Sequence, residues 1–465
     1  MSVIKITASA DTTIVNSYGV DGITRAIYAN MGAADSLEMY SISGGYATSS
    51  IERSRILVSF PYSKVSELRS AGSIPASGSA KFYLNLYNVE HPLTLPSKYY
   101  AIVRPISQSW EEGNGLDLDE YRDLGWNGTS SYGTNWVYRS SGSAWATTGG
   151  TYLAGYDKEY YFDVGTEDLS VDVTDVVEAH LNGTSSYGFG IMISGAYEDG
   201  TYGKDFFTKR FSARSSEYFY SRPSLEVRFD SGVRDDRNKF YVSASYLTSE
   251  NSQSVYYKHV INGKYSNLPS LPLVALKNSS SSTQYGSTVT ASLVSAGIYK
   301  ATFVVNANST LTSSMYANWS FSSSTLKQDE VKLYNRTAES FNEEYYFNIT
   351  NIKAKYSTSE KAFFRVYSRE KDWSPTVYTK AKTSISTTTH KNLYYKVFRV
   401  VDKKTIIDYG ITPVAYTLVS YDESGNYIDL DMSYFEAGYS YAIQLMLLNG
   451  DEKKEYLETF KFRVE

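Results

Sequence analysis

Carboxylates gather once in the sequence, shortly after residue 110. A glycoside hydrolase needs two carboxyl groups facing each other across one bond, ~5–9.5 Å apart. Glu111 and Glu112 are adjacent, so on a strand they would point in opposite directions. Asp117, Asp119 and Asp123 offer the oxygen ligands that calcium prefers, although their pattern is not that of an EF-hand. A solvated acidic loop explains the same residues. Calcium binding and a hydrolase using Glu112 are kept as alternatives.

The same region holds four of the six tryptophans, namely Trp110, Trp126, Trp136 and Trp145. Exposed aromatic rings bind sugars by stacking, so Trp126, Trp136 and Trp145 are candidates for a glycan site. Tryptophans are highly buried on average, and buried rings that anchor a long loop to a sheet explain the same residues. We predict such anchors and keep glycan binding as the alternative.

Other catalytic groups are sparse. The chain has no cysteine, which excludes disulfides, thiolate zinc sites and cysteine nucleophiles. Its histidines, His91, His180, His259 and His390, are far apart in the sequence. We expect each to pack or to lie on the surface rather than to act as a base or a ligand. The sequence therefore predicts a non-enzymatic protein that has no catalytic residue and no cofactor.

The segments that must position these residues have the pattern of strands. Tyrosine accounts for 45 of 465 residues and favours half-buried pleated surfaces. Alternation of apolar and polar side chains marks strands at 55–60, 81–87, 188–193 and 224–229. Helical spacing occurs at 173–181, with Gly183 just past the end, and a second short helix is expected at 63–70. The predicted fold class is all-β, with several β-sandwiches and few short helices.

Changes in composition divide the chain into three predicted domains. Residues 1–230 form the first, with a Trp-rich insertion at about 114–160. Polar segments separate it from domains at 236–328 and 329–465. Gly438 and Gly297 each precede a tyrosine at a strand entrance, which resembles the tyrosine corner of immunoglobulin-like sandwiches. An ordinary turn beside a common residue is the alternative.

Charge and hydropathy exclude several partners. The net charge of −5 gives no basic domain that would hold nucleic acid through its phosphates. No stretch approaches the ~20 apolar residues of a membrane-spanning helix, and the first residues lack the features of a secretory signal. We therefore expect a protein that stays in the cytoplasm or leaves the cell within a larger assembly.

Residues 1–230 resemble the DNRLRE-type β-sandwich of bacterial surface and phage proteins, which has a jelly-roll-like form. The resemblance rests on short motifs in the same order along the chain. They are Thr7–Ile14, Ala29–Gly32 with Ser36–Met39, Arg53–Phe60, Ala80–Tyr87, Trp110–Gly113, Val171–Thr174 and Ser221–Val227. The insertion departs from a minimal domain of this type, so no family binding site carries over to it.

Longer segments are similar to virion structural proteins of tailed bacteriophages. They are 117–126, 135–138, 144–145, 364–372, 395–401 and 421–435. The resemblance implies a non-enzymatic neck, collar or tail accessory protein that is assembled in the host cytoplasm and resides in the virion. The implied partners are other virion proteins and further copies of the chain. A carbohydrate-binding adhesin or receptor-binding fibre component, with a cell-surface glycan as ligand, is the alternative.

Overall fold

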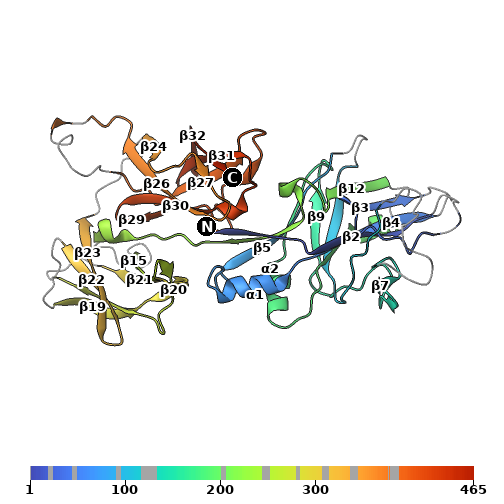
Figure 1. Cartoon of the computed structure of the whole chain (residues 1–465), viewed down its shortest axis with the longest axis horizontal. Helices are drawn as coiled ribbons and strands as arrows, with labels where there is room; N and C mark the ends of the chain where they lie inside the picture. The colour runs from blue at the N-terminus through green and yellow to red at the C-terminus, as the bar shows by residue number, and fades with distance from the viewer. Residues whose placement is uncertain are drawn as a thin grey trace. The chain divides into compact units, whose positions relative to one another are not determined.

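The computed structural model describes residues 2–18, 23, 25–43, 50–90, 96–116, 133–200, 206–242, 252–278, 283–305, 314–335, 344–374, 376–377 and 387–465. These residues form two compact units (Figure 1). One consists of residues 3–67 and 80–228, and the other of residues 1–2, 68–79 and 229–465. Strands dominate both, which confirms the predicted all-β class. No helix in the described ranges is long and apolar enough to cross a membrane.

The N-terminal unit is a β-sandwich of two sheets. The smaller sheet has the order β1 (Val3–Thr7), β13 (Ser224–Phe229), β5 (Ala80–Leu86), β10 (Leu169–Asp172). The larger sheet has the order β12 (Phe206–Ser212), β3 (Ser36–Ser43), β4 (Ile51–Ser59), β11 (Phe189–Ile193), β6 (Tyr99–Pro105), β9 (Lys158–Phe162), with β2 (Ala10–Asn16) paired to β4. A small hairpin, β7 (Tyr138–Ser140) and β8 (Ser143–Ala144), lies in the insertion.

Alternation along the strands builds the core of this sandwich. Phe82, Leu84 and Leu86 of β5 are fully buried, and they pack from the smaller sheet toward the interior. On the larger sheet, Phe189 and Ile191 of β11 are equally buried. Burying side chains of this size contributes roughly 1.5–3 kcal/mol each. Two facing apolar layers therefore stabilise the sandwich without any disulfide.

Three short helices accompany these sheets: α1 (Tyr62–Ser70), α2 (Thr174–Leu181) and α3 (Gly195–Glu198). The first two confirm the helices predicted from spacing. Val176 and Val177 of α2 are buried, as the periodicity requires. Asp172 accepts a hydrogen bond of 2.9 Å from the Thr174 N–H at the start of α2. Gly183 follows the helix with φ +104°, a conformation that glycine adopts readily.

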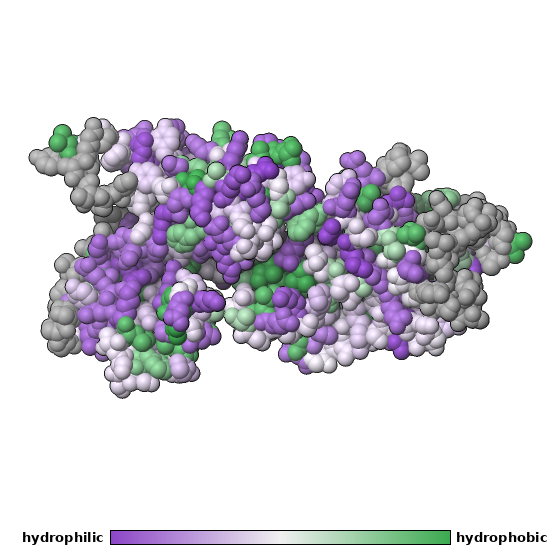
Figure 2. All heavy atoms as spheres, in the orientation of Figure 1, coloured by the Kyte–Doolittle hydropathy of each residue, from purple (hydrophilic) through white to green (hydrophobic). Residues whose placement is uncertain are grey.

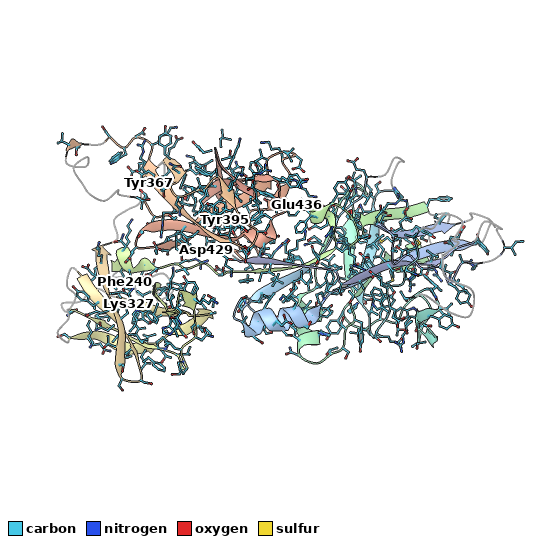
Figure 3. All side chains as sticks on the ribbon, in the orientation of Figure 1. Phe240, Lys327, Tyr367, Tyr395, Asp429 and Glu436 are labelled. Atoms are coloured by element: carbon cyan, nitrogen blue, oxygen red, sulfur yellow. The ribbon has the colours of Figure 1, made fainter. Side chains whose placement is uncertain are left out.

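The middle domain is a second sandwich. One sheet has the order β14 (Phe240–Val242), β23 (Ser324–Asn335), β22 (Ser314–Phe321), β18 (Leu273–Lys277), β19 (Gln284–Thr290). The other has the order β15 (Ser252–Lys258), β21 (Ile298–Val304), β20 (Ser292–Ser295), and β16 (Val260–Ile261) pairs with β17 (Lys264–Tyr265). Trp319 and Phe240 are fully buried between the sheets, and Figure 3 labels Phe240.

The predicted boundary between residues 328 and 329 is wrong, because it falls inside β23. That strand pairs with β22 from Ser324 to Lys332 and with β14 from Leu333 to Asn335. The middle domain therefore extends to at least residue 335. Residues 322–329 are mostly polar. A strand with an exposed polar face has the same composition as a linker, which is why the boundary was placed there.

The C-terminal domain is a third sandwich. One sheet has the order β24 (Tyr345–Ile349), β26 (Lys361–Glu370), β30 (Gly425–Asp431), β29 (Ser420–Asp422). The other has the order β25 (Lys355–Tyr356), β32 (Glu452–Val464), β31 (Ser440–Asn449), β27 (Leu393–Arg399), β28 (Thr405–Ile407). Of the short 3-10 turns, η2 (Phe219–Ser221) belongs to the N-terminal unit, η3 (Asp236–Asn238) to the linker after it, and η4 (Met432–Tyr434) to this domain. Tyr395, labelled in Figure 3, lies in the interior of this domain.

The C-terminal domain has the hydrogen bond of a tyrosine corner, but the residue is Tyr441 and not the Tyr439 that directly follows Gly438. The buried Tyr441 hydroxyl donates to the Glu436 carbonyl at 2.8 Å, five residues upstream. In the middle domain the equivalent tyrosine behaves differently, because the Tyr299 hydroxyl accepts from the distant Leu268 N–H at 2.6 Å. The pattern therefore holds in one domain of the two.

We expect Tyr441→Phe to lower the free energy of unfolding by about 1 kcal/mol, the usual net contribution of one hydrogen bond. The ring itself is retained, so its packing on Phe435 at 4.9 Å is kept. Urea unfolding measures the change. Tyr439→Phe is the matched control, because that residue is 37% exposed and its hydroxyl is expected to contribute little. An equal loss in both variants would contradict the assignment.

Candidate functional site

The Trp-rich insertion covers the outer face of the larger N-terminal sheet. Trp136 and Trp145 are only 5% and 4% exposed, and they pack with Ile14, Leu57 and Ile106. A ring buried to this degree has no face left for a sugar. Trp136 and Trp145 are therefore the anchors that we predicted, and the glycan-stacking alternative does not hold for them. Trp126 lies outside the described residues.

A buried ion pair fixes the insertion in place. The Arg55 guanidinium donates to both carboxylate oxygens of Glu198, at 2.6 and 2.8 Å, and to the Gly149 carbonyl at 2.7 Å. Its plane lies over the Trp136 ring, 4.9 Å from the centroid. Strand β4, helix α3 and the insertion thus meet on one side chain. The low exposure of both partners makes this pair far more sensitive to loss than a surface pair.

Asn30 joins the start of the insertion, at residues 112–115, to Thr134 within it. Its amide nitrogen donates to the carbonyls of Glu112 and Thr134, at 2.7 and 2.6 Å. Its oxygen accepts the N–H groups of Gly32 and Gly115, each at 3.0 Å. A Cβ at Gly32 would lie 2.2 Å from the Glu112 carbonyl oxygen. The Asn-x-Gly segment is therefore a structural clamp, and its third position must be glycine because a side chain there would clash with the Glu112 carbonyl.

The acidic stretch is held by charge pairing where it is described. Asp117, Asp119 and Asp123 lie outside the described residues, so the calcium prediction is untested. Glu112 pairs with Arg214 through both carboxylate oxygens and also accepts the Asp11 N–H at 2.8 Å. Across the described part of the chain, no group of three potential metal ligands occurs.

Asp11 is the most perturbed carboxyl of this cluster. It is 1% exposed, and burial raises its pKa to about 7, against the effect of the Arg214 N–H that it accepts at 2.6 Å. The negative charge of Glu112 acts in the same direction as burial. The carboxyl groups of Asp11 and Glu112 both contact Arg214, so together they hold the loop that contains this arginine. They lie against the chain and not across an open cleft, so the arrangement supports a structural role.

The histidines differ in environment. The His390 Nε2 lies 2.7 Å from the Ser368 hydroxyl, an arrangement that resembles a nucleophile and its base. Both side chains are buried, however, and the Tyr345 and Phe347 rings pack against the imidazole at 4.4 and 5.2 Å. A substrate has no access to this hydroxyl, so the pair is part of the core.

The other described histidines also make local contacts. His180 stacks on Tyr62 with ring centroids 4.3 Å apart and accepts the Ser186 N–H at 3.1 Å. The His259 ring lies 3.3 Å from the Tyr257 hydroxyl. His91 lies outside the described residues. None of these contacts brings a histidine to the acidic stretch.

We expect the C-terminal domain to lose stability in acid through His390. Burial lowers the pKa of this imidazole from 6.5 to about 4. Between these pH values the unfolded chain binds a proton that the folded domain does not. The stability is therefore complete above pH ~6.5 and falls by about 3 kcal/mol as the pH drops to ~4. Urea unfolding across this range measures the effect. His390→Gln should flatten the profile and His259→Gln should leave it unchanged, whereas equal profiles for wild type and His390→Gln would contradict the prediction.

The linker after the first sandwich is built into the C-terminal domain. Val233 and Tyr421 of β29 share a backbone hydrogen bond of 2.8 Å, and the Asp235 N–H donates to the Tyr421 carbonyl at 3.1 Å. The buried Asp236 then accepts from the Tyr421 hydroxyl at 3.0 Å and from the Ser254 N–H of the middle domain at 2.8 Å. This junction fixes the middle domain to the C-terminal domain through one carboxylate.

A pair of tyrosines is exposed on the N-terminal sandwich. Tyr100 of β6 and Tyr161 of β9 are opposite each other in the register, with ring centroids 4.9 Å apart. They are 41% and 44% exposed. Glu159 and Asp163 on either side of Tyr161 are also exposed. We call these four residues the tyrosine surface. Elsewhere, Figure 2 shows hydrophilic and intermediate side chains over most of the coloured face, with apolar ones in small groups.

Sequence reasoning missed two polar groups in the interior, Asn30 and Lys209. Lys209 shares the parity of Phe207 and Phe211 along β12, so strand alternation alone would have placed it inward. The clamp role of Asn30 had a weaker signal, the glycine two residues later. Both were available from the sequence, and neither is a catalytic motif.

Comparisons with known proteins concern the fold only. Neither a known protein family nor a curated protein sequence matches the chain. Among solved structures, a chimeric titin Z1Z2 tandem is 10% identical, covers 49% of this chain and 96% of its own, and has a TM-score of 0.16. Fibronectin(III)-like modules of Clostridium thermocellum CbhA are 11% identical, with 50% and 90% covered and a TM-score of 0.14.

A third match spans nearly the whole chain. Salmonella alpha-2-macroglobulin is 8% identical and has a TM-score of 0.16, with 99% of this chain and 26% of that protein covered. Scores this low establish no common arrangement of domains. The assignment of β-sandwiches rests on the sheets themselves.

Proposed function

We propose that this chain is a non-enzymatic structural component of a tailed-phage particle, a neck, collar or tail accessory protein that acts through protein–protein interfaces. The proposal extends the sequence resemblance. The observation that supports it best is the tyrosine surface, because tyrosine is enriched where proteins bind each other and gives a large contact area at low entropic cost.

The sheet holds this surface rigidly. Tyr100 and Tyr161 lie on paired strands whose inner neighbours, Tyr99 and Phe162, stack at 5.1 Å in the core. The exposed rings therefore need little ordering on binding, which favours affinity. Exposed Glu159 and Asp163 add negative charge around the rings. A partner with arginine or lysine side chains would find both a ring face and a carboxylate there.

Co-sedimentation with purified particles tests the proposal. We expect the wild-type chain to be found in virions. Tyr100→Ala combined with Tyr161→Ala should reduce its incorporation at least tenfold, which corresponds to a loss of ~1.4 kcal/mol or more of binding free energy. Tyr218→Ala is the matched control, because it removes another exposed tyrosine. A chain that is never associated with particles would refute the virion role.

A further inference from the structure

The interior of the N-terminal sandwich contains a lysine with no role in the clamp, the ion pair or the tyrosine surface. Lys209 of β12 is 0% exposed. Its Nζ lies 2.6 Å from the Asn88 Oδ1, 2.9 Å from the Gly165 carbonyl oxygen and 2.7 Å from the Glu167 carbonyl oxygen. The rings of Phe162 and Phe211 lie over the amine, 5.0 and 5.1 Å from their centroids. The amine is thus held in a closed, largely apolar site.

The backbone fixes the other partner, Asn88, equally well. Asn88 bridges to Phe211, and hydrogen bonds of 3.0 and 3.2 Å join the residues on either side of it to β12. Its own N–H donates to an Asp168 carboxylate oxygen at 2.7 Å. The amine and the carboxamide are therefore held together by the strands that carry them and not by their own contact alone.

We infer that Lys209 and Asn88 form an intramolecular isopeptide bond, a covalent cross-link between the end of β5 and strand β12. The inference goes beyond the proposed function and does not depend on it. It follows from the geometry of the amine. The amine donates to the carbonyls of Gly165 and Glu167 and to the Asn88 Oδ1, and these three hydrogen bonds hold Nζ against the Asn88 carboxamide. Loss of the proton shared with Asn88 leaves a lone pair on Nζ beside the carboxamide whose Cγ it attacks.

Burial also supplies the neutral amine that such a reaction needs. Burial lowers the pKa of Lys209 to about 8, so an appreciable fraction is unprotonated near neutral pH. The carboxylate of Glu167 is occupied by the N–H groups of Val164 and Gly165 at 2.6 and 2.7 Å. The Asp168 carboxylate accepts the Asn88 backbone N–H and its charge acts on the Lys209 amine, so we assign Asp168 as the group that accepts and returns the proton.

The reaction is balanced without any co-reactant. The Nζ of Lys209 attacks the Cγ of Asn88, and a new C–N bond forms. The bond from Cγ to Nδ2 then breaks. The nitrogen leaves as ammonia with the proton that Nζ gives up, so one amide replaces another and nothing is oxidised or reduced. Holding the two groups in contact removes most of the entropic barrier of a bimolecular reaction.

The intact mass of the denatured full chain tests the inference. We expect it to lie below the mass of the sequence by one ammonia, about 17 Da. Proteolysis should yield one branched peptide that contains Asn88 and Lys209, with no tryptic cleavage after Lys209. The full sequence mass, both in fresh protein and after prolonged incubation at mildly alkaline pH, would overturn the inference.

Cyclisation at Asn–Gly sequences loses the same mass and must be distinguished. The chain has five such sequences, namely Asn114–Gly115, Asn127–Gly128, Asn182–Gly183, Asn262–Gly263 and Asn449–Gly450. Their cyclic products hydrolyse in mild alkali and join no two peptides, whereas an isopeptide bond survives and does. A loss of ammonia located only at these positions, with Asn88 and Lys209 recovered in separate peptides, counts against the cross-link.

Variants assign the two partners. Asn88→Ala and Lys209→Met should each have the full mass expected of its sequence, and Asp168→Asn should lower the cross-linked fraction while the fold is retained. Lys158→Met is the matched control, since it removes a lysine of the same sandwich whose ion pair with Asp175 is exposed, and it should still lack one ammonia. If a variant does not fold, the wild-type mass and its branched peptide decide alone.

Discussion

Asp236→Ala should lower the stability of the unit formed by the middle and C-terminal domains by about 3 kcal/mol. The carboxylate is buried and accepts hydrogen bonds from the Tyr421 hydroxyl and the Ser254 N–H, and it pairs with Lys391 at 3.0 Å. Its removal leaves two buried donors without an acceptor. Because these donors belong to different domains, the loss falls on the junction, and we expect one unfolding transition to separate into two.

Urea unfolding followed by near-ultraviolet circular dichroism measures both effects. Asp236→Asn retains one carbonyl oxygen and should give an intermediate loss. Asp230→Ala is the matched control on the same linker, because its ion pair with Arg234 is about one-third exposed and is expected to contribute at most ~1 kcal/mol. An equal loss for Asp236→Ala and Asp230→Ala would mean that the junction does not depend on the buried carboxylate.

The sequence predicted this fold at the level of elements better than at the level of domains. Alternation and helical spacing identified strands such as 81–87 and both longer helices, because each depends on which face of a single segment is buried. The boundary placed at 328 was wrong because β23 has a polar exposed face, and a polar stretch in a strand differs from a linker only through its pairing partners. Those partners are distant in the sequence.

Candidate sites were harder to predict than elements, for a related reason. The sequence does not distinguish a tryptophan that stacks on a ligand from one that packs in the core. Only the tertiary packing shows that Trp136 and Trp145 are anchors. The same is true of Glu112, whose neighbour in the sequence suggested chemistry and whose partner in space, Arg214, gives it a structural role. By contrast, the inward position of Lys209, which the sequence analysis missed, depends only on parity along one strand, and this is local information.

The largest loss in the N-terminal unit is expected from Glu198→Ala. This substitution leaves the Arg55 guanidinium buried without its carboxylate, and breaking a buried pair in this way typically costs about 3–5 kcal/mol. The Gly149 carbonyl and the Trp136 ring remain as partners, so the arginine keeps part of its environment. The insertion should loosen with it, which hydrogen exchange at residues 133–150 would detect as faster exchange.

A double substitution separates the charge effect from a packing effect. Arg55→Met with Glu198→Leu removes both charges while filling much of the same volume, and replacements of this kind are often close to neutral. We therefore expect the double variant to be more stable than Glu198→Ala by several kcal/mol.

Asp157→Ala is the control for an exposed pair. It breaks the ion pair with Arg104 and should cost no more than ~1 kcal/mol. If the double variant were as unstable as Glu198→Ala, loss of volume and not an unpaired guanidinium would be the cause. The insertion would then be held by its tryptophans and by the Asn30 hydrogen bonds, without a contribution from the ion pair.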